Sequence, residues 1–142
     1  MSSPTVAGLA DRVVEGQRYL AEMRTSVGLR SSASKLTARV DELGCRMLFP
    51  ASSHADALVA VAVALDDGLR VVTLPEIVAQ GIDKVVVVEV VAVSGLQVRR
   101  AVEAVRRAGA HWVGAAVLHD LSDGQENEPA RFGPVDGLRL AS

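Results

Sequence analysis

Cysteine and aromatic residues are scarce in this chain, and their scarcity excludes several classes of protein. Cys45 is the only cysteine, which excludes an intrachain disulfide framework and a cysteine metal cluster. It stands at the start of an apolar run, where we expect a buried structural thiol. Aromatic residues make up only 3% of the chain, so the hydrophobic core has to be built from Val, Ala and Leu.

A strong excess of charge and long apolar runs are also missing. The formal net charge is only −2, which gives no electrostatic reason to expect a nucleic-acid partner. The longest apolar runs, near Ala57–Leu65 and Val85–Val93, are far shorter than the ~20 residues that cross a bilayer. The amino terminus lacks the continuous apolar segment of a signal peptide. We therefore expect a cytoplasmic protein with no membrane partner.

The chain does contain a large aliphatic fraction. Apolar residues make up 49% of its 142 residues, and this length predicts a single domain over 1–142. An aliphatic core of this kind suits a parallel sheet with helices on both faces.

Two helices are predicted before the first strand. The first spans about Pro4 to Val27, with Ser3 as its N-cap, and forms the N-terminal part of the domain, residues 1–30. The second spans Ala33 to Leu43, capped by Ser31 or Ser32 and ended by a glycine. The apolar stripe of the first helix either covers the domain's own sheet or forms a dimer contact, and the sequence leaves both interpretations open.

Strands and helices alternate through the core, residues 33–118. The expected strands are Cys45–Phe49, Leu69–Leu74, Lys84–Val91 and Trp112–Leu118; the expected helices are Ala55–Leu65 and Gln97–Ala108, with at most a helical turn over Pro75–Gln80. This order predicts a three-layer α/β fold with a mainly parallel sheet flanked by helices. Residues 119–142 are expected to form a C-terminal loop, His119–Pro134, and a candidate edge strand, Val135–Leu140.

The strongest functional signal is the stretch KVVVVEVVAVSGLQV, Lys84 to Val98, which contains the third expected strand and leads into a helix. Ligands of open parallel sheets bind outside the carboxyl ends of the strands. An anion could bind at the start of the helix from Gln97, where the backbone amides are free. The hydroxyl of Ser94 and the backbone of Gly95 lie next to these amides in the sequence. Glu89 could accept hydrogen bonds from the hydroxyl groups of a ligand or neutralise the charge of a metal ion, and His54, in the loop after the first strand, could donate to a phosphate.

This stretch resembles the type I phosphoribosyltransferases. In that family, four apolar residues precede two adjacent acids, two apolar residues and a loop of the Thr-Thr-Gly-Gly-Thr type. Val85–Val88 match the apolar run, Glu89 matches the first acid, and Ser94 and Gly95 match the middle of the loop. The resemblance covers roughly residues 33 to 118.

The resemblance implies a phosphoribosyltransferase-like fold and a set of roles. The acids of the family hold the ribose hydroxyls of phosphoribosyl pyrophosphate, and the loop cradles its 5′-phosphate. The first strand, the loop with Ser53 and His54, and the helix after it are similar to the family's pyrophosphate-binding unit. No cofactor is expected, except magnesium if phosphoribosyl pyrophosphate is bound.

Five departures from the family pattern argue against turnover. Val90 replaces the second acid, Leu96 replaces the second loop glycine, and Gln97 replaces the final hydroxyl residue. Ser53-His54-Ala55 stand where the family tends to place glycines, and Pro75–Asp83 is too short for the family's mobile lid. Ribosyl transfer needs charge stabilisation in a closed site, and these departures weaken both.

Three hypotheses of function follow. The leading one is a non-catalytic phosphoribosyltransferase-like protein that acts as a regulatory or interaction module and binds a phosphate-bearing ligand or nucleotide. The first alternative is an active phosphoribosyltransferase acting on phosphoribosyl pyrophosphate and a nucleobase, and the second is a structural homo-oligomer assembled through the N-terminal helix. A homodimer is the expected assembly. The expected ligand-binding residues are Glu89, Ser94, Gly95, Leu96, Gln97, Ser53 and His54, with no catalytic or metal-binding residue.

Arginines recur along the helix that follows the phosphate-type loop. Arg99, Arg100, Arg106 and Arg107 lie at helical spacing, and Glu103 is four residues from Arg99 and from Arg107. This pattern predicts a solvent face with internal salt bridges.

Overall fold

Five parallel strands form the centre of the domain. The computed structural model describes residues 6–121 and 132–140. The strands are β1 (Met47–Pro50), β2 (Arg70–Val71), β3 (Lys84–Ala92), β4 (Trp112–Asp120) and β5 (Gly137–Leu140). All neighbouring pairs are parallel, in the order β2-β1-β3-β4-β5. The predicted α/β class with a parallel sheet is confirmed, and the candidate strand at the end of the chain is present as β5.

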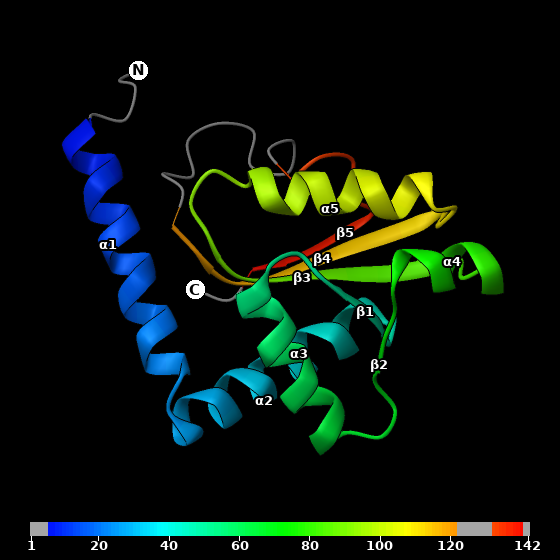
Figure 1. The fold of residues 1–142 in the computed structure, drawn as a ribbon, viewed down its shortest axis with the longest axis horizontal. Coiled ribbons are helices and arrows are strands. Elements are labelled where there is room, and N and C mark those ends of the chain that lie inside the picture. Colours follow the sequence, from blue (N-terminus) through cyan, green and yellow to red (C-terminus); the bar gives the residue numbers. More distant parts are fainter. Residues whose placement is uncertain (1–5, 122–131, 141–142) are drawn as a thin grey trace.

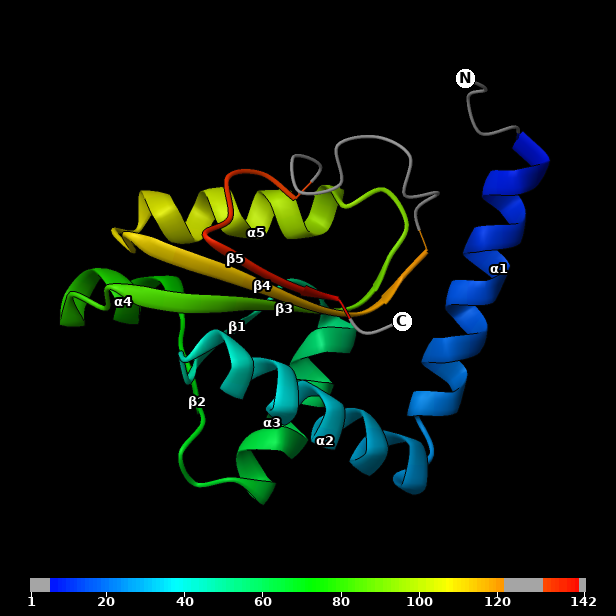
Figure 2. The same ribbon diagram turned by 180° about the vertical axis from the view of Figure 1, so that it is seen from behind.

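Helices cover both faces of the sheet and give the fold three layers (Figures 1 and 2). One face carries α2 (Ser26–Leu43) and α3 (Ser53–Leu65), and the other carries α4 (Leu74–Gln80) and α5 (Leu96–Arg107). Val86 and Val88 of β3 pack with the first pair, whereas Val85 and Val87 pack with the second. A strand buried on both faces is apolar throughout, which explains the run of four valines. None of the described helices combines the length and apolar character needed to cross a bilayer.

The first helix, α1 (Val6–Met23), stands at the carboxyl edge of the sheet and covers neither face (Figures 1 and 2). The prediction of one helix running to Val27 is wrong, and the expected start at Ser3 and Pro4 lies outside the described residues. The helix ends early because Thr25 caps a new one. Its hydroxyl accepts a hydrogen bond from the Gly28 N–H at 3.0 Å.

The second helix is longer than predicted. It begins at Ser26, so Ser31 and Ser32 lie inside the helix and do not cap it. Its end at Gly44 is as predicted, with the glycine in the left-handed conformation at φ 71°. Cys45, which follows, is buried as expected, although β1 begins only at Met47.

The predicted second strand, Leu69–Leu74, is wrong in length. β2 contains only two residues, because Thr73 and Glu76 form a capping box that starts α4. The Thr73 hydroxyl accepts the Glu76 N–H, and the Glu76 carboxylate accepts the Thr73 N–H. The expected helical turn after this strand is therefore a helix of seven residues.

The end of β4 also differs from the prediction. His119 and Asp120 were expected to begin the C-terminal loop, but both belong to the strand, where they pair with Val91 and Ala92. The His119 ring stacks on Tyr19 of α1, with ring centroids 3.9 Å apart and planes 9° from parallel. This stack attaches α1 to the carboxyl edge of the sheet.

The strand order contains a topological switch point between β1 and β3. The chain leaves β1 towards β2 on one side and leaves β3 towards β4 on the other. The helices that follow these two strands, α3 and α5, lie on opposite faces of the sheet. In open α/β sheets this arrangement opens a crevice at the carboxyl ends of the strands, where ligands bind.

Candidate functional site

Glu89 lies at the switch point, one residue past the last pair that β3 forms with β1. That last pair joins Pro50 to Val88, and the Ala51 N–H donates to the Val88 carbonyl at 2.9 Å. Beyond this pair, the backbone of β3 has no residue of β1 beside it with which to form a hydrogen bond. The side chain of Glu89 supplies the missing acceptor, because its Oε1 accepts the Val90 N–H at 2.9 Å. One oxygen of the carboxyl group therefore has a structural role.

Ser52 links the same oxygen to α3. Its hydroxyl donates a 2.6 Å hydrogen bond to Oε1 of Glu89. Its Oγ also accepts the Ala55 N–H at 3.2 Å, which makes Ser52 the N-cap of α3. The loop after β1 and the end of β3 are thus joined through one side chain.

The second carboxyl oxygen of Glu89 has no hydrogen-bond partner in the part of the chain that the structure describes. Glu89 is only 3% exposed, and Oε2 is a buried polar atom without a hydrogen bond among the described residues. Burial raises the pKa of Glu89, and the hydrogen bonds from Ser52 and Val90 offset only part of that effect. The carboxyl group of Glu89 therefore stays protonated to a higher pH than the carboxyl group of an exposed glutamate.

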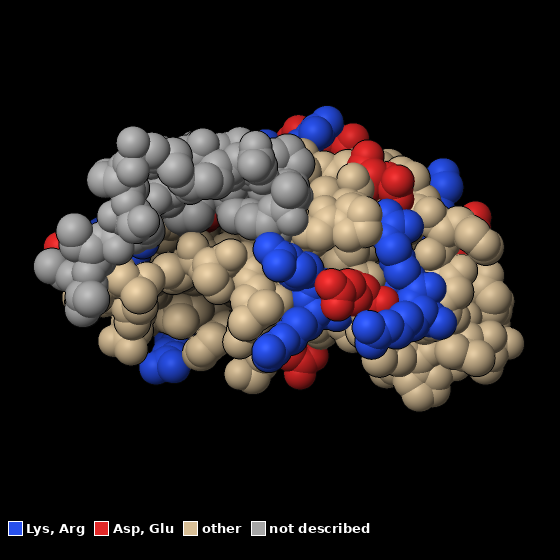
Figure 3. Space-filling view, turned by 90° about the horizontal axis from the view of Figure 1, so that it is seen from above, with Lys and Arg blue, Asp and Glu red and all other residues tan. Residues whose placement is uncertain are grey.

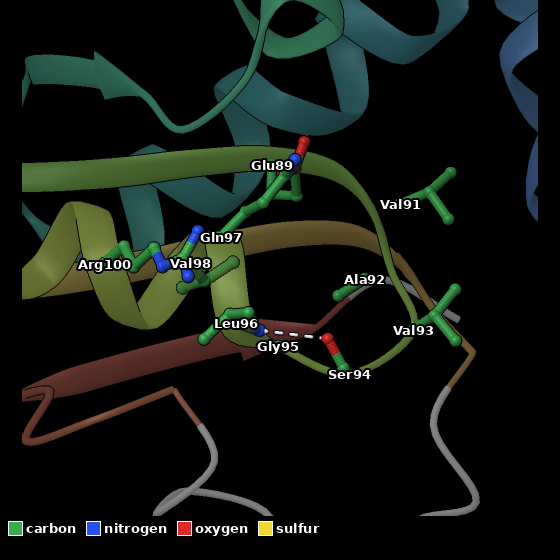
Figure 4. Close-up of a pocket in the computed structure, with 10 residues that line it drawn as sticks. All are labelled: Glu89, Val91, Ala92, Val93, Ser94, Gly95, Leu96, Gln97, Val98 and Arg100. Atoms are coloured by element: carbon green, nitrogen blue, oxygen red, sulfur yellow. Dashed lines mark hydrogen bonds between the residues drawn. The ribbon is translucent and has the colours of Figure 1, made fainter.

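The loop from β3 to α5 borders a hollow of about 370 Å³. Gly95 is the N-cap of α5, with φ 82°, and it has no side chain to cap the helix. The Ser94 hydroxyl accepts the Leu96 N–H at 3.3 Å, as Figure 4 shows. The amides of the first turn lack intrahelical partners, so the helix presents N–H groups and its positive dipole end to this hollow. The lining residues are Glu89, Val91, Ala92, Val93, Ser94, Gly95, Leu96, Gln97, Val98 and Arg100.

Arg100 supplies a positive charge to the hollow. It lies one turn after Leu96, and in Figure 4 its guanidinium extends along α5 to the first turn of the helix, beside Gln97. Figure 3 shows the same layer from outside, where basic side chains flank a small acidic cluster. The predicted salt bridges of Glu103 with Arg99 and Arg107 are not among the ion pairs of the described residues.

A second, smaller hollow of about 200 Å³ lies between α1 and the same edge. From α1 it is lined by Val13, Gly16, Gln17 and Leu20, and from the sheet edge by Ser52, His54, Glu89, Val91, Val93 and Gln97. Glu89 and Gln97 thus border both hollows. The N-terminal helix forms one wall of the site.

The structure brings most of the predicted site residues together. Glu89, Ser94, Gly95, Leu96 and Gln97 line the larger hollow, and His54 lines the smaller one. The loop expected over Pro50–His54 is shorter than predicted, because α3 begins at Ser53, so Ser53 and His54 lie in its first turn. Ser53 is exposed and lines neither hollow.

Arg100, which the sequence pattern assigned to a solvent face, was missed as a site residue, and so were two further contributors. Ser52 was assigned to the loop without a role, although a serine three residues before Ala55 is an N-cap signal that could have found it. The contribution of α1 has no local signal, because it depends on tertiary packing. Among the described residues, no group of three or more His, Cys, Asp or Glu side chains is placed to hold a metal ion.

A scan against protein-family models finds no match for this sequence, and a search of the curated proteins finds none either.

Proposed function

We propose that this chain is a non-catalytic relative of the type I phosphoribosyltransferases that binds a phosphate-bearing small molecule at the β1/β3 switch point and acts as a regulatory or interaction module. The observation that carries the proposal is the buried Oε2 of Glu89, which has no hydrogen-bond partner among the described residues and borders the same hollow as the amino terminus of α5, where Gly95 offers no side-chain cap. An unsatisfied buried polar atom costs about 1–3 kcal/mol, so a ligand that pairs with it gains that amount.

The two ends of the hollow suit two parts of one ligand. The amides of the first turn of α5 suit a phosphate group, for which a helix terminus contributes up to ~2 kcal/mol when partly buried. Oε2 of Glu89 suits a sugar hydroxyl, because a hydroxyl group can donate to the carboxylate and can also accept from the neutral acid. A volume of about 370 Å³ is within the range of small-molecule sites. The ligand class is therefore a sugar phosphate or nucleotide.

The surroundings of Glu89 favour binding without turnover. Val90, at the position of the family's second acid, is 1% exposed and packs in the core on the α2–α3 side, away from both hollows. The connection from β2 to β3 consists of the short helix α4 and its flanking residues, which leaves no segment to close over a transition state. Leu96 is 44% exposed at the mouth of the hollow, where the family has a glycine.

Thermal unfolding with added ligand tests the proposal. Ribose 5-phosphate, nucleoside monophosphates and phosphoribosyl pyrophosphate with magnesium are titrated separately. A ligand at 100 times its dissociation constant adds about 2.7 kcal/mol, which raises Tm by several degrees for a domain of this size. The absence of a shift with all of these ligands would overturn the proposal. Pyrophosphate release in the presence of a nucleobase would instead establish the alternative, an active phosphoribosyltransferase.

A homo-oligomer assembled through α1 is the second candidate, and one observation favours it. Leu9, Val13 and Val14 of α1 are 46%, 43% and 65% exposed. Three large apolar side chains exposed on one helix form an unusually apolar surface for contact with solvent. Sedimentation of the wild type and of Val14→Glu tests this assembly: a dimer that dissociates in the variant supports it, and a wild-type monomer excludes it.

A further inference from the structure

Arg100 reaches the hollow because of the direction of helical side chains. Residues four apart lie on one face of a helix, and long side chains point back towards the amino terminus. Arg100 is four residues after Leu96, the first residue of α5. Its side chain therefore runs back along α5, and its guanidinium lies beside the first turn of the helix, as Figure 4 shows.

The charge of Arg100 is not neutralised by a carboxylate of the described residues. Arg106, on the same helix, contrasts with it: its guanidinium donates to Asp136 at 2.8 Å and to the carbonyls of Pro134 and His111. The acid among the described residues that line the larger hollow is Glu89, whose pKa is raised by burial. Among the described residues Arg100 thus has no carboxylate partner, and it lies next to helix amides that also favour negative charge.

We propose that Arg100 binds the phosphate group at the amino terminus of α5 and makes the site selective for a doubly charged phosphate monoester over a carboxylate. This inference rests on the proposed ligand site described above. A guanidinium offers a fixed fork of donors that matches two phosphate oxygens, and the helix amides take the remaining oxygen. A carboxylate carries one charge and fewer oxygens, so it cannot use both sets of donors fully.

The matched control for Arg100 is Arg107. Both are exposed arginines of α5 without an ion pair among the described residues, but Arg107 lies in the last turn, at the far end of the helix. Arg100→Ala and Arg107→Ala therefore change the net charge equally. Arg100→Lys keeps the charge and removes the fork.

Calorimetric titration of the full chain with ribose 5-phosphate, inorganic phosphate and ribonate (a carboxylate of similar size) tests the inference at two salt concentrations. We expect Arg100→Ala to weaken phosphate binding about tenfold or more. The affinity of Arg100→Lys for phosphate should lie between those of Arg100→Ala and the wild type. Arg107→Ala should bind phosphate with an affinity within about twofold of the wild type. The preference for ribose 5-phosphate over ribonate should fall in Arg100→Ala, and so should the salt dependence of binding.

The failures of the two proposals are distinguishable. Phosphate binding that is unchanged in Arg100→Ala, or weakened equally by Arg107→Ala, overturns the role of Arg100 and leaves the ligand site intact. A wild-type protein that binds neither ribose 5-phosphate nor inorganic phosphate overturns the ligand site, and the role of Arg100 with it. Circular dichroism of each variant shows whether the protein has kept its helical content.

Discussion

Ser52 and Glu89 are 37 positions apart in the sequence, and the hydroxyl of the first donates a 2.6 Å hydrogen bond to the carboxyl group of the second. The same hydroxyl oxygen accepts the Ala55 N–H and so caps α3. The start of a helix on one face of the sheet and the position of a buried acid at its edge therefore depend on one side chain.

Replacing Ser52 by alanine should lower the free energy of unfolding by about 2 kcal/mol. The variant loses the α3 cap, which contributes about 1 kcal/mol, and it removes a donor from the buried Glu89 carboxyl group. Urea unfolding measures the loss. Ser53→Ala is the control, because Ser53 is exposed and does not cap the helix, and its effect should stay within about 0.5 kcal/mol. Equal losses in the two variants would contradict the capping role of Ser52.

Glu89→Gln should stabilise the protein at neutral pH. Burial raises the pKa of Glu89 in the folded protein, so the folded state holds this proton more tightly than the unfolded chain. Its contribution to stability is therefore complete below the ordinary glutamate value of about 4.3 and is lost as pH rises through the folded pKa. Glutamine keeps an oxygen for Ser52 and Val90 but carries no charge at any pH.

Urea unfolding at several pH values from 4 upwards tests this expectation. The wild type should lose stability relative to Glu89→Gln as pH rises, and the two curves should converge at the acid end. Glu103→Gln is the control, because Glu103 is an exposed acid on α5. Curves for wild type and Glu89→Gln that stay parallel over this range would show that Glu89 titrates as an ordinary exposed acid.

The parallel core and the larger hollow could be predicted from the sequence because their signals are local. Burial on both faces forces β3 to be a run of valines, and Ser94 and Gly95 are typical residues for a tight turn into a helix. Glu89 stood out because it is the only charged residue inside that run. The turn at Ser94 and Gly95 was therefore found, although β3 continues to Ala92 and α5 begins at Leu96, one residue before the expected Gln97.

The rest depends on interactions that local patterns do not contain. The apolar periodicity continues through Thr25, so the break between α1 and α2 is visible only from the cap that Thr25 forms. Ser52 and Ser53 are equivalent as N-cap candidates in the sequence, and the hydrogen bond to Glu89 distinguishes them. The place of α1 at the carboxyl edge follows from long-range contacts such as the Tyr19–His119 stack.

The Tyr19–His119 stack should make the attachment of α1 dependent on pH. Burial lowers the pKa of His119, an effect that Lys35 reinforces and that Glu22 and Glu15 oppose. The unfolded chain then binds this proton more tightly, so the stability due to His119 is complete above its ordinary value of about 6.5. It is lost as pH falls through the folded pKa.

His119→Phe retains an aromatic ring and removes the titration. We expect the variant to lose less stability than the wild type between about pH 6.5 and pH 5, as measured by urea unfolding. A wild-type profile in His119→Phe would mean that another group accounts for the loss.

Gly16 sets how closely α1 approaches the sheet. A Cβ atom at this position would lie 2.9 Å from Cγ1 of Val91 and 3.5 Å from Cδ1 of Leu121. Alanine ordinarily stabilises a helix by up to about 1 kcal/mol relative to glycine. Here the added methyl group meets a β-branched side chain with little rotamer freedom, so Gly16→Ala should destabilise the protein by about 1 kcal/mol.

A double-mutant cycle with Val91→Ala isolates this contact. Removing the valine methyl groups makes room for the new Cβ, so the double variant should be more stable than the sum of the two single changes predicts, by about 0.5–2 kcal/mol. Urea unfolding of the four proteins gives the coupling energy. Gly16 and Val91 both line the smaller hollow, so a loosened α1 should also weaken the ligand-induced rise in Tm. If Gly16→Ala stabilises the protein equally in both backgrounds, α1 does not pack on Val91 at this distance in solution.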